Sequence, residues 1–210
     1  MSGPSSSPEP RLDLSATKFT DRDETRAKIF ADLVSMPIQL KYLIVENFQC
    51  LVYVIEHTCD HLRKNALHTV QFAEFSISSC NFGTNEAIHT GKHLVPFLST
   101  YMPNLQTLRL WRPDDFPWTS IRPNFKYGYY YGVSMGQWQR TLNTPQSINE
   151  HVAVFEQDLS QLFEQLKQLV YLDIHGDTSS EKIEPYRLMV QTRFPNSQID
   201  IQISRFRLWM

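Results

Sequence analysis

The chain has 210 residues, 41% of them hydrophobic and 20% charged, a balance that supports one folded domain with a substantial core. The formal net charge of −2 argues against an overall basic field for nucleic acid or anionic membranes, and no apolar run reaches the roughly 18 residues of a membrane span. Three cysteines are too few, and odd in number, to indicate a disulfide framework. We therefore expect a cytoplasmic or nuclear protein without nucleic-acid or membrane partners.

The first 20 residues are mostly small, polar and proline-rich. They lack the basic start and apolar centre of a secretory signal, and their composition is typical of a disordered segment. The sequence therefore predicts a disordered tail at 1–20, followed by one domain at 21–210.

Within that domain a short phrase, Leu-x-x-Leu-x-Leu, recurs. Copies begin at Leu40, Leu67, Leu105 and Leu169, and a degenerate copy begins at Ile199. Helical patterns lie between the copies, at 24–34, 51–63, 85–101, 149–168 and 180–194. The spacing falls within the roughly 20–29 residues of leucine-rich repeats at two of the four steps. An ordinary α/β domain is the alternative explanation of the same pattern.

Two of the expected helices carry local signals at their ends. Gly91 and Pro96 interrupt the pattern at 85–101, so we expect this helix to start late or to kink. Ser147 and Glu150 have the spacing of a capping box, which predicts that the helix at 149–168 begins just after it.

Side chains alternate across a strand, so each copy of the phrase predicts one buried and one open side. Leu43, Val70, Phe72, Leu108 and Leu172 should face the helices. The result would be a short, irregular α/β solenoid, with a parallel sheet on its concave side and helices on its convex side. The open side should then bind a protein, because tyrosine, tryptophan and arginine anchor protein interfaces. The alternative is that these residues merely solvate the sheet. The candidate protein-binding residues on this side are Tyr42, Glu46, Gln71, Arg109, Trp111, Tyr171, Asp173 and His175.

A segment rich in aromatic residues interrupts the repeats at 111–146. It contains proline and glycine, which favour an ordered loop or hairpin over a helix. One interpretation is a loop that packs its own rings against the side of the solenoid. A second is a partner-binding loop, with Trp118 as a further candidate binding residue, and a remote third is base stacking.

No catalytic or metal-binding motif stands out. His57 and His61, like His89 and His93, are one helical turn apart, but no further metal-ligand motif accompanies either pair. A phosphate-cradling glycine loop and a dinucleotide fingerprint are also missing from the sequence. We therefore predict a protein that is not an enzyme and holds neither a metal nor a cofactor. A hydrolase with a site near 111–138 is a remote alternative.

The repeated strands, the phrase that begins at Met102 and the helix-to-strand run at 159–174 resemble leucine-rich repeats of the ribonuclease-inhibitor-like type. More narrowly, residues 25–205 resemble the C-terminal repeat region of F-box/leucine-rich-repeat proteins, although residues 1–40 contain no recognisable F-box. In that family the F-box docks on a cullin-RING ubiquitin ligase and the repeats hold the substrate. The resemblance therefore implies a substrate-recognition module, with a cullin-RING ligase adaptor as a candidate partner. A structural or regulatory fragment that assembles with another chain is the alternative.

Overall fold

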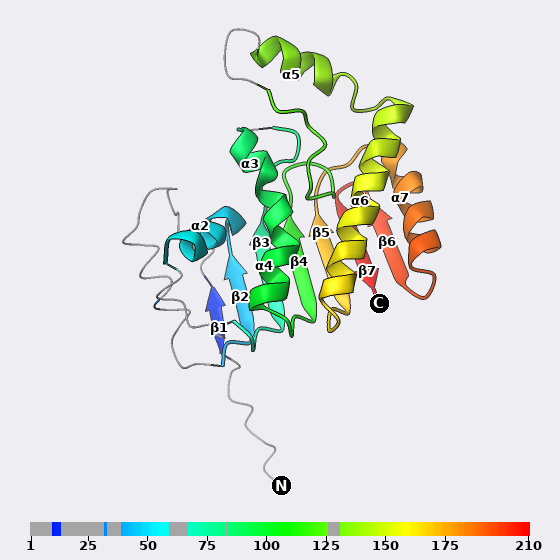
Figure 1. Ribbon diagram of the computed structural model, residues 1–210. Helices are drawn as coiled ribbons and strands as arrows, with labels where there is room; N and C mark the ends of the chain where they lie inside the picture. The colour runs from blue at the N-terminus through cyan, green and yellow to red at the C-terminus, as the bar shows by residue number, and fades with distance from the viewer. Residues whose placement is uncertain (1–9, 14–31, 33–38, 59–66, 83, 126–130) are drawn as a thin grey trace.

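The computed structural model describes residues 10–13, 32, 39–58, 67–82, 84–125 and 131–210. Its central feature is a seven-stranded sheet with the strand order β1-β2-β3-β4-β5-β7-β6 (Figure 1). The strands β1 to β5 pair in parallel, whereas β7 is antiparallel to both of its neighbours. The prediction of an α/β fold with a mostly parallel sheet is therefore confirmed.

The strands are short and the helices vary in length. The strands are β1 (Arg11–Asp13), β2 (Tyr42–Val45), β3 (Phe72–Ser76), β4 (Thr107–Trp111), β5 (Tyr171–His175), β6 (Gln198–Gln202) and β7 (Arg205–Trp209). The described helices are α2 (Phe48–Thr58), α3 (Asn85–His89), the 3-10 helix η1 (Thr90–His93), α4 (Leu94–Tyr101), α5 (Tyr131–Gln139), α6 (Pro145–Gln165) and α7 (Ser180–Arg193).

The core lies between the sheet and helices that cover one of its faces. Phe48 of α2 packs on Phe75 of β3, with 5.6 Å between ring centroids. Phe155 of α6 lies 4.9 Å from Phe206 of β7 and 5.1 Å from Tyr186 of α7. These contacts place α2, α6 and α7 on the same face, and Figure 1 shows α4 beside α6 on that side. No helix of the described residues packs on the opposite face.

The second copy of the repeat is shifted from its predicted place. By register, Ala73 pairs with Leu43 on one side and Leu108 on the other, so the phrase begins at Val70 rather than at Leu67. A shift of three residues is odd, so it exchanges the two faces of β3. Phe72, predicted to face the helices, therefore lies on the opposite face. Val70, which precedes the strand, is buried in the core as predicted.

The C-terminal strands also differ from a simple repeat. The degenerate copy at Ile199 does form β6, but β6 does not pair with β5. The chain reverses at Ile203 and Ser204, and β7 inserts between β5 and β6, antiparallel to both. The alternating pattern at 205–209 fits a strand, yet it lies outside the leucine phrase and was not predicted.

The helix ends differ from the predictions where caps and breakers decide them. Helix α6 begins at Pro145, and its cap is Thr144, whose hydroxyl accepts the Ser147 N–H at 3.3 Å; the capping box predicted around Ser147 is therefore wrong. The pattern at 85–101 starts at Asn85 and is divided into α3, η1 and α4 around Gly91, whereas Pro96 lies in the first turn of α4 and does not interrupt it. Helix α7 closely matches its predicted range.

Three predictions fall wholly or partly outside the described residues. The helix predicted at 24–34 lies outside the described residues except for Asp32, which is helical. The structure also does not describe the end of the helix predicted at 51–63, from residue 59 on, or most of the tail predicted at 1–20. Within that tail, Arg11–Asp13 forms β1 in parallel with β2, so the prediction of disorder is wrong for these three residues.

Gly91 should tolerate no side chain. A Cβ atom there would lie 1.7 Å from the carbonyl oxygen of Trp118 and 2.6 Å from its carbonyl carbon, and neither backbone atom can rotate away. We expect Gly91→Ala to lower the free energy of unfolding by about 3 kcal/mol, measured by urea denaturation. The matched control is Gly136→Ala in α5, where nothing lies within 4 Å of the new Cβ. Equal stability of the two variants would contradict the close approach of η1 to the 111–122 segment.

Candidate functional site

The sheet face opposite the helices, called here the open face, carries three rows of side chains that run across the strands. One row is mainly aromatic, one is mainly charged and one is mixed. The residues, row by row, are Arg11, Tyr42, Phe72, Thr107, Tyr171, Trp209 and Gln198; then Asp13, Ile44, Glu74, Arg109, Asp173, Arg207 and Asp200; then Ser76, Trp111, His175, Arg205 and Gln202.

Asp173 is the centre of the charged row. It is 0% exposed, and its carboxylate accepts hydrogen bonds from Arg109 Nε at 3.2 Å and from Arg205 Nε and Nη2 at 2.9 Å each. Burial acts to raise the pKa of Asp173, but the arginines and His175 outweigh it and hold the pKa below its ordinary value. Asp173 therefore stays ionised and positions the two arginines on either side of it.

Trp111 and His175 form an exposed stacked pair beside that row. Their ring centroids are 3.9 Å apart at an interplanar angle of 15°, and Trp111 is 44% exposed. The indole Nε1–H donates to Glu74 at 2.7 Å, which fixes the orientation of the ring. Partial burial lowers the pKa of His175, opposed by Asp173 and assisted by Arg205 and Arg109, so the imidazole is neutral near pH 7.

A second aromatic pair lies in the first row. Tyr171 stacks on Trp209 with 5.2 Å between centroids, and the Arg207 guanidinium lies 5.8 Å from the Trp209 ring centroid. Arg109 lies similarly over Phe72, at 5.6 Å. Each of these arginines thus lies beside an aromatic surface that a bound chain can contact.

Most of the predicted binding residues do come together on the open face. Trp111, Tyr171 and His175 are partly exposed there, as are Tyr42 and Arg109. Asp173 also belongs to this face, but its complete burial gives it a positioning role rather than a direct contact.

Gln71 lies outside the open face, and Glu46 lies at its edge, where the alternation of Tyr42 and Ile44 continues. Glu46 is exposed just after β2, and Gln71 precedes β3. The Gln71 carbonyl accepts the N–H groups of Gln106 and Thr107 at 2.9 Å. The prediction that placed Gln71 on the sheet face is wrong because of the shifted repeat.

The open face also contains residues that the sequence reasoning missed. These are Phe72 and Glu74, which the correct register would have found, and Arg205, Arg207 and Trp209, which the alternation of β7 indicates.

Trp118 is not a binding residue. It is 2% exposed and packs edge-to-face on Phe155, with 6.3 Å between centroids. The backbone N–H groups of Trp118 and Thr119 each donate to Asp158 of α6 at 3.0 Å. The first part of the insertion therefore packs into the core, as one of the two main interpretations predicted. The expectation of a loop or hairpin rather than a helix is wrong for Tyr131–Gln139, which forms α5.

The insertion also contributes to a buried polar cluster at the carboxyl ends of the parallel strands. Asp115 is 2% exposed and accepts hydrogen bonds from Lys182 Nζ at 2.5 Å, Thr178 Oγ1 at 2.7 Å and Tyr186 OH at 3.0 Å. Burial acts to raise the pKa of Asp115, but the Lys182 ammonium and the hydrogen bonds outweigh it and lower the pKa. This cluster ties the segment after β4 to α7.

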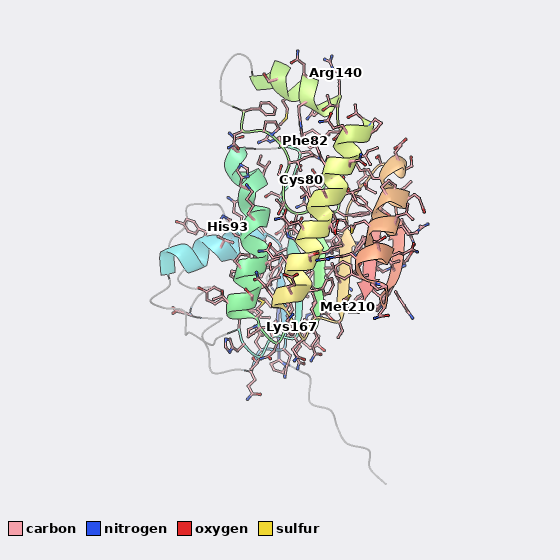
Figure 2. The ribbon with its side chains drawn as sticks, turned by 45° about the vertical axis from the view of Figure 1, so that its right-hand side comes forward. Cys80, Phe82, His93, Arg140, Lys167 and Met210 are labelled. Atoms are coloured by element: carbon pink, nitrogen blue, oxygen red, sulfur yellow. The ribbon has the colours of Figure 1, made fainter. Side chains whose placement is uncertain are left out.

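A second group of buried polar residues, around Asp114, joins the segments that follow β3 and β4. Asp114 accepts hydrogen bonds from Ser79 Oγ at 2.5 Å, from the Asn81 N–H at 3.0 Å and from Arg112 Nη2 at 3.3 Å. Figure 2 shows the neighbouring Cys80 above the ends of the strands. Burial is the main cause that raises the pKa of the Cys80 thiol far above its ordinary value, so it stays protonated and is a poor nucleophile.

In the part of the chain that the structure describes, no group of three or more potential metal ligands gathers, and His89 and His93 gain no further ligand. The His89 ring contacts Asn124 instead, at 2.6 Å. His61 lies outside the described residues.

Two further observations concern the chain as a whole. Among the described residues, no helix has the length and apolar character needed to cross a lipid bilayer. Comparison of the chain with protein-family models, with curated proteins and with solved structures found no match.

Proposed function

We propose that this protein is a non-enzymatic interaction module that binds a partner protein through the open face. The observation that carries the proposal is the open face itself, a largely parallel sheet surface with aromatic and arginine side chains and no described helix over it. Parallel sheets are ordinarily covered on both faces. Trp111, at 44% exposed, and Trp209, at 37%, offer the kind of side chain on which binding energy concentrates.

We further propose that the fold is a divergent leucine-rich-repeat solenoid. Its support is that Leu40, Val70, Leu105 and Leu169 occupy equivalent positions in the strand register and that all four are buried. A recognition module for a cullin-RING ubiquitin ligase is the specific form of this proposal, and it rests on the resemblance to F-box/leucine-rich-repeat proteins.

The alternatives have less support. Assembly through an open end of the solenoid would favour exposed core at 40–45, yet Leu43 is 0% and Val45 3% exposed, and β1 pairs with β2. For a hydrolase near 111–138, the carboxylates of Asp114 and Asp115 are the nearest candidates. Both are buried and already engaged by protein donors.

We expect Trp111→Ala to lower partner affinity at least tenfold without changing the melting temperature by more than about 2 °C. The side chain is 44% exposed and packs on His175 outside the core, so its loss removes contact surface but little core. The partner is first captured from a reduced lysate with the intact chain and identified by mass spectrometry. Its affinity for the purified variants is then measured by calorimetry.

The matched control is Leu188→Ala, which removes another exposed apolar side chain, 55% exposed, from α7 on the other side of the sheet. A partner that is lost with Leu188→Ala but kept by Trp111→Ala would contradict binding through the open face. Capture of a cullin-RING adaptor by all three chains, with other proteins lost only from Trp111→Ala, would support the ligase form. A partner that depends on Trp111, without any adaptor, would support a separate binding module.

A further inference from the structure

The carboxylates in the middle of the open face already accept hydrogen bonds from their neighbours. Both oxygens of Asp173 accept from arginine, and Glu74 accepts from Arg109 Nη1 through Oε2 and from the Trp111 indole through Oε1. A partner that offers mainly cations would therefore have to displace an existing ion pair.

The arginines of this face, in contrast, have donors to spare. A guanidinium carries five N–H groups. Arg109 uses Nε and Nη1, and Arg207 uses Nη2 toward Asp200. Among the described residues, Arg109 Nη2 and Arg207 Nη1 have no protein acceptor, whereas Arg207 Nε is buried and out of a partner's reach. Each of these arginines therefore keeps one terminal nitrogen that can donate to a partner, beside the ion pairs that it already makes.

The spacing of the two arginines restricts the shape of a partner. In the strand register, Arg109 and Arg207 lie opposite Asp173 on the two strands that flank β5, so their backbones are two strand spacings apart, about 10 Å. A chain in the polyproline II conformation rises about 3.1 Å per residue with three residues per turn. Its side chains i and i+3 therefore lie on the same side of the chain and about 9 Å apart, close to the spacing of the two arginines.

Aromatic rings lie next to both arginines, in the adjacent row. Phe72 lies beside Arg109, and the stacked Tyr171 and Trp209 lie beside Arg207. Flat rings of this kind are the surfaces on which proline-rich segments dock.

We propose that the open face binds an acidic, proline-containing segment of a partner protein in the polyproline II conformation. Two carboxylates three residues apart hydrogen-bond to Arg109 and Arg207, and the prolines between and beside them pack on the aromatic row. This inference rests on the proposed function and specifies the chemistry of the partner.

The test is selection of a random 12-residue peptide library on the immobilised full chain, followed by fluorescence anisotropy with synthetic copies of the enriched peptides. We expect enriched peptides with Asp or Glu at i and i+3 and with proline nearby. Their affinity should fall about tenfold with Arg207→Gln, less with Arg207→Lys, and progressively as salt rises from 50 to 200 mM. Arg187→Gln is the control, since Arg187 is paired with Glu184 on α7, away from this face.

The outcomes separate this inference from the function on which it rests. Enriched peptides without acidic residues that are lost with Trp111→Ala would overturn the acidic segment but keep binding through the open face. Acidic peptides that bind Arg207→Gln as tightly as the parent chain would also overturn it, provided that the variant keeps its melting temperature. Peptides that depend on neither Trp111 nor Arg207 would overturn both.

Discussion

Replacing Lys182 with methionine should destabilise the fold by about 3–5 kcal/mol at neutral pH. Lys182 is 4% exposed, and its ammonium lies 2.5 Å from the Asp115 carboxylate, which is itself 2% exposed. Methionine keeps most of the volume but leaves the buried carboxylate without a countercharge. Thr178 and Tyr186 still donate hydrogen bonds, but neither carries a positive charge. Urea unfolding followed by tryptophan fluorescence measures the loss.

The loss should depend on pH with a defined sign. In the parent chain the pKa of Asp115 is lowered on folding, so its stabilising contribution is present above the pKa of the unfolded chain and disappears as pH falls through the folded pKa. Without Lys182, burial raises that pKa instead, and protonation relieves the buried charge. The difference between the parent chain and Lys182→Met should therefore be largest near pH 7 and should narrow toward pH 4.

A double variant tests whether the pair is the cause. Asp115→Asn combined with Lys182→Met removes both charges while an amide oxygen remains to accept from Thr178 and Tyr186. We expect the double variant to be more stable than Lys182→Met alone. A double variant as unstable as the sum of the two single changes would show that the charges act independently.

Leu108→Asp should prevent folding altogether. Leu108 is 0% exposed in β4, between Ala73 and Leu172 in the register. The change loses about 2–5 kcal/mol of buried apolar contact and adds several more for a buried carboxylate without a partner. The sum matches the 5–15 kcal/mol by which a whole domain is ordinarily stable. Circular dichroism and size-exclusion chromatography should report an unfolded or aggregated chain.

Thr107→Asp is the matched control, because Thr107 is the neighbouring residue on the open face. It should remain folded, and equal loss of structure in the two variants would contradict the strand register. Arg109 is a less suitable neighbour, although it too lies on the open face. Its guanidinium pairs with Glu74 and with the buried Asp173, so Arg109→Asp would bring three carboxylates together and destabilise the sheet.

Local sequence patterns predicted the strands that repeat the leucine phrase without distortion. The copies at Leu40, Leu105 and Leu169 lead into β2, β4 and β5, and Trp111, Tyr171 and His175 lie on the predicted face. These predictions hold because alternation along one strand is a local property, set by the geometry of the extended chain. Helix α7 closely matches its predicted range because a helical pattern is likewise set by residues close together in the sequence.

Register between strands is not local, and here the predictions differ from the structure. Leu67 and Val70 are both buried, so the apolar pattern alone allows either to begin the second copy. Because Ala73 pairs with Leu43 and with Leu108, the second copy of the phrase begins at Val70. The position of β7 between β5 and β6 is likewise decided by pairing between strands.

The buried cluster around Asp115 shows the same division most clearly. Its partners lie 63, 67 and 71 residues away in the sequence, and no local spacing connects them. By itself, the sequence determined the α/β class, the alternation of the leucine strands and the open-face residues of β4 and β5, since each depends on neighbours along the chain. Only the tertiary structure decided the register of β3, the insertion of β7 and the burial of Trp118 and Asp115. Each of these depends on contacts between segments that are distant in the chain, and the free energy of packing selects them.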